Sequence, residues 1–164
     1  MSLRPELTPP QINETLVERL ARLADQLDGS RRDKESAVWL AEFNALANTQ
    51  LNWIDFQGIY GAVTHDEWVR GVLRRAQAPK APDMTRDEIV EVVRRVCEAQ
   101  GSESEISYYL HLLETQLPQA NISDSIFYSD REMTPAEIVD AALATQTRAS
   151  APIALPPSSL SEPR

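Results

Sequence analysis

Four cap motifs constrain the fold of this chain more than any other feature of its sequence. Each places Ser or Thr three residues before Glu at the head of an apolar repeat: Thr64–Glu67, Thr85–Glu88, Ser102–Glu105 and Thr134–Glu137. In such a capping box the hydroxyl and the carboxylate each accept a hydrogen bond from the other residue's backbone N–H, which starts a helix. The four motifs therefore predict four helix starts and favour an all-α chain.

Apolar residues at three- and four-residue steps predict where these helices bury side chains. The inward-facing residues are expected to be Trp68, Val69, Val72 and Leu73, then Ile89, Val92, Val93, Val96 and Cys97, then Ile106, Tyr109, Leu110 and Leu113, and finally Ile138, Val139, Ala142 and Leu143. Pro135 stands at the first position of the last helix, where proline is favoured. Each helix is therefore expected to be amphipathic.

Two more helices are predicted before the first cap motif, over about 12–28 and 32–49. The first repeats Ile12, Leu16, Leu20, Leu23 and Leu27, and the second is expected to bury Val38, Trp39, Phe43 and Leu46. Asn52 to Gly61 lacks such a period, so we expect an irregular segment or a short helical turn there.

Composition predicts the domain boundaries. Residues 77–83 are rich in small residues and proline and are predicted to be a linker. They separate an N-terminal helical domain at 1–76 from a second domain at 84–148, and the Pro- and Ser-rich residues 149–164 are predicted to be a disordered tail. Both halves have two long helices, a short aromatic segment and a further helix, so a divergent repeat remains open. The predicted fold is two small helical bundles in tandem.

The second half carries most of the negative charge. The formal net charge is −1 over residues 1–80 and −8 over 81–164, and Arg131 is the only Lys or Arg within 101–140. A negative field attracts basic protein surfaces and repels phosphate backbones. We therefore expect no nucleic-acid partner. An acidic face that serves only solubility is the alternative.

Residues that carry chemistry are few. His65 and His111 are the only histidines, Cys97 is the only cysteine, and no metal, phosphate-loop or nucleophile motif occurs. Cys97 is predicted to be a buried apolar residue. We expect no enzyme, no metal and no cofactor. One cysteine and the lack of a long apolar run favour a cytoplasmic protein without a membrane span.

Ser123–Tyr128 combines aromatic rings with a carboxylate between two predicted helices. Exposed rings beside Asp124 would suit contact with a basic protein surface, because aromatic residues dominate binding energy at interfaces. Alternatively, Phe127 and Tyr128 pack into the core and Asp124 caps its own short helix. Ile126 is expected to point inward.

Five motifs occur in order along residues 84–145. They are Thr85-x-x-Glu88-Ile89-Val90, Val96-Cys97, Ser102–Glu105, Ser123-Asp124-x-Ile126-Phe127-Tyr128 and Thr134-Pro135-x-x-Ile138-Val139. In this order and spacing they resemble the DNase-type colicin and pyocin immunity proteins. The chain departs from that family at Phe127 and Ser129, where the family has tyrosine and proline, in a shorter loop at 129–133, and in the absence of a tryptophan from the last helix.

The resemblance implies a four-helix bundle with a short third helix that binds and inhibits a basic HNH-type nuclease toxin. The family's variable recognition helix corresponds to Ile106, Ser107, Leu110 and Glu114, and Glu103 extends this face. Its shared anchor corresponds to Ser123, Asp124, Phe127 and Tyr128. An acidic adaptor for a different basic partner is the alternative function, and a small hydrolase is the weakest one.

Overall fold

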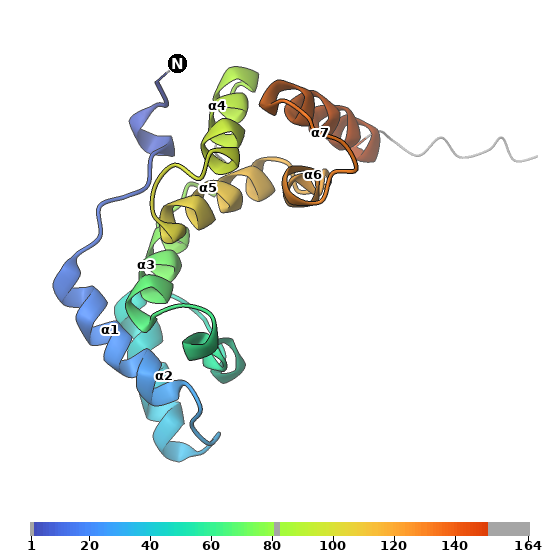
Figure 1. Cartoon of the computed structure of the whole chain (residues 1–164). Helices are drawn as coiled ribbons and strands as arrows, with labels where there is room; N and C mark the ends of the chain where they lie inside the picture. The colour runs from blue at the N-terminus through green and yellow to red at the C-terminus, as the bar shows by residue number, and fades with distance from the viewer. Residues whose placement is uncertain (1, 81–82, 151–164) are drawn as a thin grey trace, which may run out of the picture.

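The computed structural model describes residues 2–80 and 83–150, and every regular element in these ranges is helical (Figure 1). The α-helices are α1 (Glu14–Leu27), α2 (Lys34–Ala47), α3 (His65–Ala76), α4 (Arg86–Cys97), α5 (Glu103–Gln116), α6 (Ile122–Phe127) and α7 (Pro135–Ser150). Three 3₁₀ turns are η1 (Pro5–Leu7), η2 (Trp53–Phe56) and η3 (Ile59–Gly61). The all-α prediction is confirmed. Most of the predicted tail lies outside the described residues.

The cap motifs start α4, α5 and α7 as predicted. The Thr85 hydroxyl accepts a hydrogen bond from the Glu88 N–H at 3.3 Å, and the Glu88 carboxylate accepts one from the Thr85 N–H at 2.9 Å. The boxes that begin at Ser102 and Thr134 close in the same way. At α3 only half of the box forms, because the Thr64 hydroxyl accepts from the Glu67 N–H while the Glu67 carboxylate turns to another helix.

Buried side chains form two hydrophobic clusters. The first cluster lies among α1, α2, η2, η3 and α3, where Phe43 and Phe56 meet edge to face with ring centroids 4.8 Å apart. The prediction that Val38 is buried is wrong, since this residue is 64% exposed. Ser36, Trp39, Leu40, Phe43 and Ala47 follow one stripe of α2 at helical steps, and Val38 lies off that stripe.

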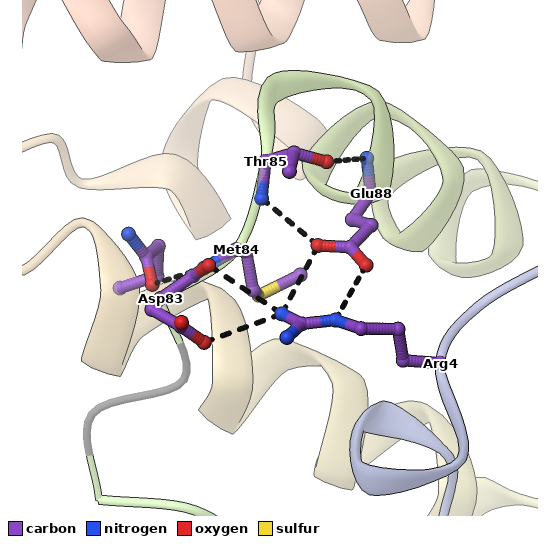
Figure 2. Close-up of polar contacts among 6 residues, drawn as sticks. Arg4, Asp83, Met84, Thr85 and Glu88 are labelled. Carbon is purple, nitrogen blue, oxygen red and sulfur yellow. Dashed lines mark hydrogen bonds and ion pairs between the residues drawn. The ribbon is translucent and has the colours of Figure 1, made fainter.

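The second cluster contains the buried hydrophobic residues of α4 to α7 together with Leu3 and Leu7. The N-terminal segment therefore runs from α1 to the second half of the molecule, beside α4 (Figure 1). Figure 2 shows Arg4 beside Asp83 and Glu88 at the start of α4. The predicted domain at 1–76 thus does not coincide with one hydrophobic cluster.

Helices α3 and α5 form the main contact between the two halves of the chain, and they lie next to each other in Figure 1. Helix α4 packs on α5 and α7, and α6 packs on both α5 and α7. None of the described helices has the length and apolar character needed to cross a membrane.

Candidate protein-binding surface

Helix α6 holds the predicted anchor residues. It begins after Asn121, whose left-handed backbone (φ 47°) turns the chain, and it closes where the Tyr128 N–H donates to the Asp124 carbonyl at 2.8 Å. Ile122 is buried and Ile126 packs against the second cluster, one helical turn apart. The inward prediction for Ile126 is confirmed. Because Ile122 and Ile126 point inward, Phe127 and Tyr128 face away from the core.

Both anchor rings are exposed. Phe127 is 54% exposed and Tyr128 is 80% exposed, so neither ring packs into the core. Asp124 is also exposed, and no hydrogen bond or ion pair reaches its carboxylate from the rest of the described chain. Asn121 is the N-cap of α6, so Asp124 does not cap this helix. The three residues form an acidic-aromatic surface, which we call the anchor surface.

The C-terminal half of α5 adjoins the anchor surface. The Ser123 hydroxyl donates to the Glu114 carboxylate at 2.7 Å, which brings together two of the predicted contact residues. Leu110 and Ile106 are half-buried and pack against the second cluster, so their side chains are only partly accessible. Among the predicted recognition residues of α5, Glu114 therefore lies directly beside α6.

The N-terminal half of α5 meets α3 instead. The Ser107 hydroxyl accepts a hydrogen bond from Arg75 Nη1 at 3.0 Å. Glu103, Ser104 and Ser107 line a cleft of about 210 Å³ whose other wall is α3. The family resemblance predicts that Glu103 and Ser107 contact the partner. In the structure, both residues line the cleft between α5 and α3, a helix of the first half of the chain.

This junction between α3 and α5 was not predicted. The Glu67 carboxylate accepts a hydrogen bond from the Ser104 N–H at 2.7 Å, so α3 supplies a cap for α5. Arg74 donates to the hydroxyl of Ser104, which is only 2% exposed, and Arg74 Nε is buried without a hydrogen-bond partner in the described chain. A Ser-x-Ser sequence at a helix start carries no signal for such a contact.

A second pocket lies beside Phe127. It has a volume of about 320 Å³ and is lined by Cys97, Ser125, Ile126, Phe127, Ser129, Asp130, Arg131, Glu132, Met133 and Ile138. Helices α4, α6 and α7 contribute Cys97, Ile126, Phe127 and Ile138, and the loop between α6 and α7 contributes the charged residues together with Met133. This pocket was not predicted, because Cys97 lies far from residues 125–138 in the chain.

The prediction that Cys97 is buried is wrong, since its side chain is exposed. Helix α4 ends at Cys97, and Val96 takes the last inward position of the stripe. Partial desolvation and the nearby Glu98 carboxylate raise the pKa of the Cys97 thiol. A raised pKa disfavours the thiolate, so this cysteine lacks the feature that activates a nucleophile.

Several carboxylates of α4 and α7 pair with arginines, whereas those near the anchor surface form no ion pair within the described residues. Arg86 pairs with Asp140 at 2.8 Å, and Arg94 and Arg95 both pair with Glu91. Asp130 and Glu132 form no ion pair within the described residues, although Arg131 lies between them in the chain. The segment from α6 to the start of α7 therefore presents carboxylates that no ion pair neutralises within the described residues.

Each half of the chain contains one histidine. His65 Nε2 lies 3.0 Å from the Asp28 carboxylate, which also accepts the backbone N–H groups of Gly58 and Tyr60. This arrangement secures the loop before α3. His111 is half-buried, and desolvation lowers its pKa. The described residues contain no group of three or more His, Cys, Asp or Glu side chains placed to hold a metal ion.

Comparisons of the chain with protein-family models, with curated proteins and with solved structures gave no match.

Proposed function

We propose that the chain is an immunity protein that binds a basic nuclease toxin and inhibits it, acting in the cytoplasm of the cell that makes the toxin. The observation that carries this proposal is the exposure of Phe127 and Tyr128 beside the unpaired carboxylate of Asp124. Exposed aromatic residues grouped on one element are typical of protein-binding sites.

The chemistry of the anchor surface suits a basic partner. Aromatic rings bury a large area with little loss of side-chain entropy, and Asp124 offers a carboxylate to an arginine or lysine of the toxin. The net charge of −8 on residues 81–164 speeds association with a positively charged protein. It also repels DNA, so a bound immunity protein beside the nuclease active site would block substrate access without entering the catalytic centre.

The arrangement of α4 to α7 supports the same proposal. The resemblance implies four helices with a short third helix, and α6 is a six-residue helix between two longer ones. We assign the contact to Ser123, Asp124, Phe127 and Tyr128 of the α6 region and to Glu114 of α5. The Ser123 hydroxyl bonds to the Glu114 carboxylate, whereas Glu103 and Ser107 line the α3–α5 cleft.

The proposal can be tested by mixing the purified full chain with an HNH-type nuclease domain encoded beside it and measuring the dissociation constant by calorimetry. We expect Asp124→Ala and Tyr128→Ala each to weaken binding by at least about tenfold, since interface hot spots contribute 2 kcal/mol or more, as an order of magnitude. Tyr60→Ala is the matched control, because Tyr60 is a similarly exposed tyrosine at 86% in the first half.

Nuclease activity separates this function from the adaptor alternative. An immunity protein should abolish DNA cleavage by the toxin in a one-to-one mixture, and Tyr128→Ala should restore cleavage at concentrations where the unchanged chain inhibits. Binding without inhibition would favour an acidic adaptor. Absence of a complex with the neighbouring nuclease would overturn the proposal.

A further inference from the structure

We propose that the pocket beside Phe127 receives an arginine side chain of the partner, and that the loop at 129–133 selects the partner. This inference rests on the proposed function, because it takes the anchor surface to be the contact surface. It assigns a role to residues that the family resemblance leaves without one.

The walls of the pocket suit the two parts of an arginine. Ile126, Met133 and Ile138 offer apolar surface to the aliphatic stem, and the Phe127 ring offers a face to the guanidinium. Asp130 and Glu132 line the same pocket and bring carboxylates to it. A planar guanidinium can stack on a ring and pair with a carboxylate at the same time, which an ammonium group does less well.

The local charges favour this occupant. Asp130 and Glu132 form no ion pair within the described part of the chain, so a partner's guanidinium would not have to displace an internal one. Arg131 lines the pocket as well and would repel a guanidinium placed next to it. Arg131 therefore restricts an incoming guanidinium to positions near Asp130 or Glu132.

The loop is better placed than α5 to select a partner. The Ser107 hydroxyl is bonded to Arg75, and Glu103 lines the α3–α5 cleft. By contrast, Ser129, Asp130, Arg131 and Glu132 are exposed beside Phe127. Loops tolerate changes of sequence and length, so partner choice can change there without disturbing the core.

Cys97 provides a direct reporter of occupancy. It is the only cysteine in the chain, it is exposed, and it lines the pocket. A side chain seated in the pocket should shield the thiol. We therefore expect formation of the complex with the neighbouring nuclease domain to slow the reaction of Cys97 with a small maleimide by at least about tenfold. The rate is measured by mass spectrometry of the full chain at saturating partner.

The double variant Asp130→Asn/Glu132→Gln tests the carboxylates. Truncating a charge that pairs across an interface typically weakens binding by about tenfold to a thousandfold, so we expect a change in that range. The matched control is Glu18→Gln, which removes one exposed carboxylate from α1, outside the candidate contact residues, and should change affinity less than about threefold. Circular dichroism should be unchanged in both, since all three carboxylates are exposed.

The outcomes separate the two proposals. If the unchanged chain binds no neighbouring nuclease, the proposed function fails. If it binds, but Cys97 in the complex reacts at the rate of the free chain and the double variant binds as tightly as Glu18→Gln, the pocket is unoccupied and this inference is overturned while the proposed function stands. Protection of Cys97 that is lost when one arginine of the nuclease is changed to alanine would identify the occupant.

Discussion

Arg4 and Glu88 are 84 positions apart in the chain and form a two-point ion pair. Arg4 Nε donates to Glu88 Oε1 at 2.7 Å, and Arg4 Nη2 donates to Glu88 Oε2 at 3.2 Å. Figure 2 shows that the same carboxylate also accepts the Thr85 N–H at the start of α4. The Thr85 N–H and the Arg4 guanidinium hold the pKa of Glu88 below its usual value. One buried carboxylate thus begins a helix and secures the N-terminal segment.

Replacing Arg4 with alanine should lower the free energy of unfolding. The Glu88 side chain is only 8% exposed. After the change its carboxylate still accepts the Thr85 N–H, but it no longer has the Arg4 guanidinium to balance its charge. The control is Arg19→Ala, because Arg19 pairs with Glu42 at the same 2.7 Å on an exposed surface, where ion pairs contribute little. Urea unfolding checks the prediction. Equal losses for the two variants would contradict it.

Leu7→Ala should destabilise the second hydrophobic cluster, although residue 7 precedes α1. Leu7 is 1% exposed and lies in the cluster formed by α4 to α7. Truncation of a buried leucine costs about 2–5 kcal/mol. Hydrogen exchange should therefore accelerate in α4 and α5 more than in α2. Acceleration confined to α1 and α2 would show that the N-terminal segment does not stabilise the second cluster.

Ser104→Ala should weaken the junction between α3 and α5. The substitution removes the hydroxyl that accepts from Arg74, whose Nε is already buried without a partner in the described chain. Leaving a buried donor unsatisfied costs about 1–3 kcal/mol. Ser107→Ala is a milder change, since Arg75 is exposed and water can replace the lost hydroxyl. Thermal unfolding of the two variants gives the comparison.

Local hydrogen bonds explain why the helices could be predicted from the sequence. A capping box joins residues three apart, so the start of α4 can be recognised from Thr85 and Glu88 alone. At Glu67 the same spacing does not lead to a closed capping box. Its spacing from Thr64 matches the other three motifs, yet its carboxylate caps α5 through the Ser104 N–H. Nothing local distinguishes the two outcomes, because the competing partner lies 37 residues away.

The candidate site was predicted only in part, for a related reason. A six-residue helix such as α6 has too few turns for a hydrophobic period, so the exposure of Phe127 and Tyr128 depends on where α5 and α7 lie. The pocket beside Phe127 likewise combines α4, α6 and the loop at 129–133. The burial of Cys97 was predicted wrongly because α4 ends at this residue. The burial of Val38 was predicted wrongly because this residue lies one position away from the buried stripe of α2.

Tyr128→Ala should leave the stability of the free chain nearly unchanged. Substitutions at exposed positions usually alter the free energy of unfolding by less than about 0.5 kcal/mol, and Tyr128 is 80% exposed. Tyr108→Ala is the contrast, because that ring is 1% exposed and its loss should cost several kcal/mol, about 3–5 by analogy with Phe→Ala. A large loss of stability in Tyr128→Ala would mean that the ring packs in the core.

The pH dependence of stability should reveal the Glu91 ion pairs. Hydrogen bonds from Arg94 and Arg95 lower the pKa of Glu91 from 4.5 to about 2 in the folded chain. Since the folded pKa is depressed, the unfolded chain binds more protons between these values. The stabilisation is complete above pH 4.5 and is lost as the pH falls towards 2. We expect it to be about 2 kcal/mol, given that Arg94 is partly solvated.

Glu91→Gln isolates this contribution, because glutamine has nearly the same shape and no titrating group. The variant should be less stable than the unchanged chain at pH 7, and the difference between their free energies of unfolding should shrink as the pH falls from 4.5 towards 2. Asp140→Asn is a useful comparison. The Asp140 carboxylate pairs with Arg86 on the exposed surface, so salt should reduce its effect more than that of Glu91. A difference between Glu91→Gln and the unchanged chain that stays constant over this range would contradict the depressed pKa.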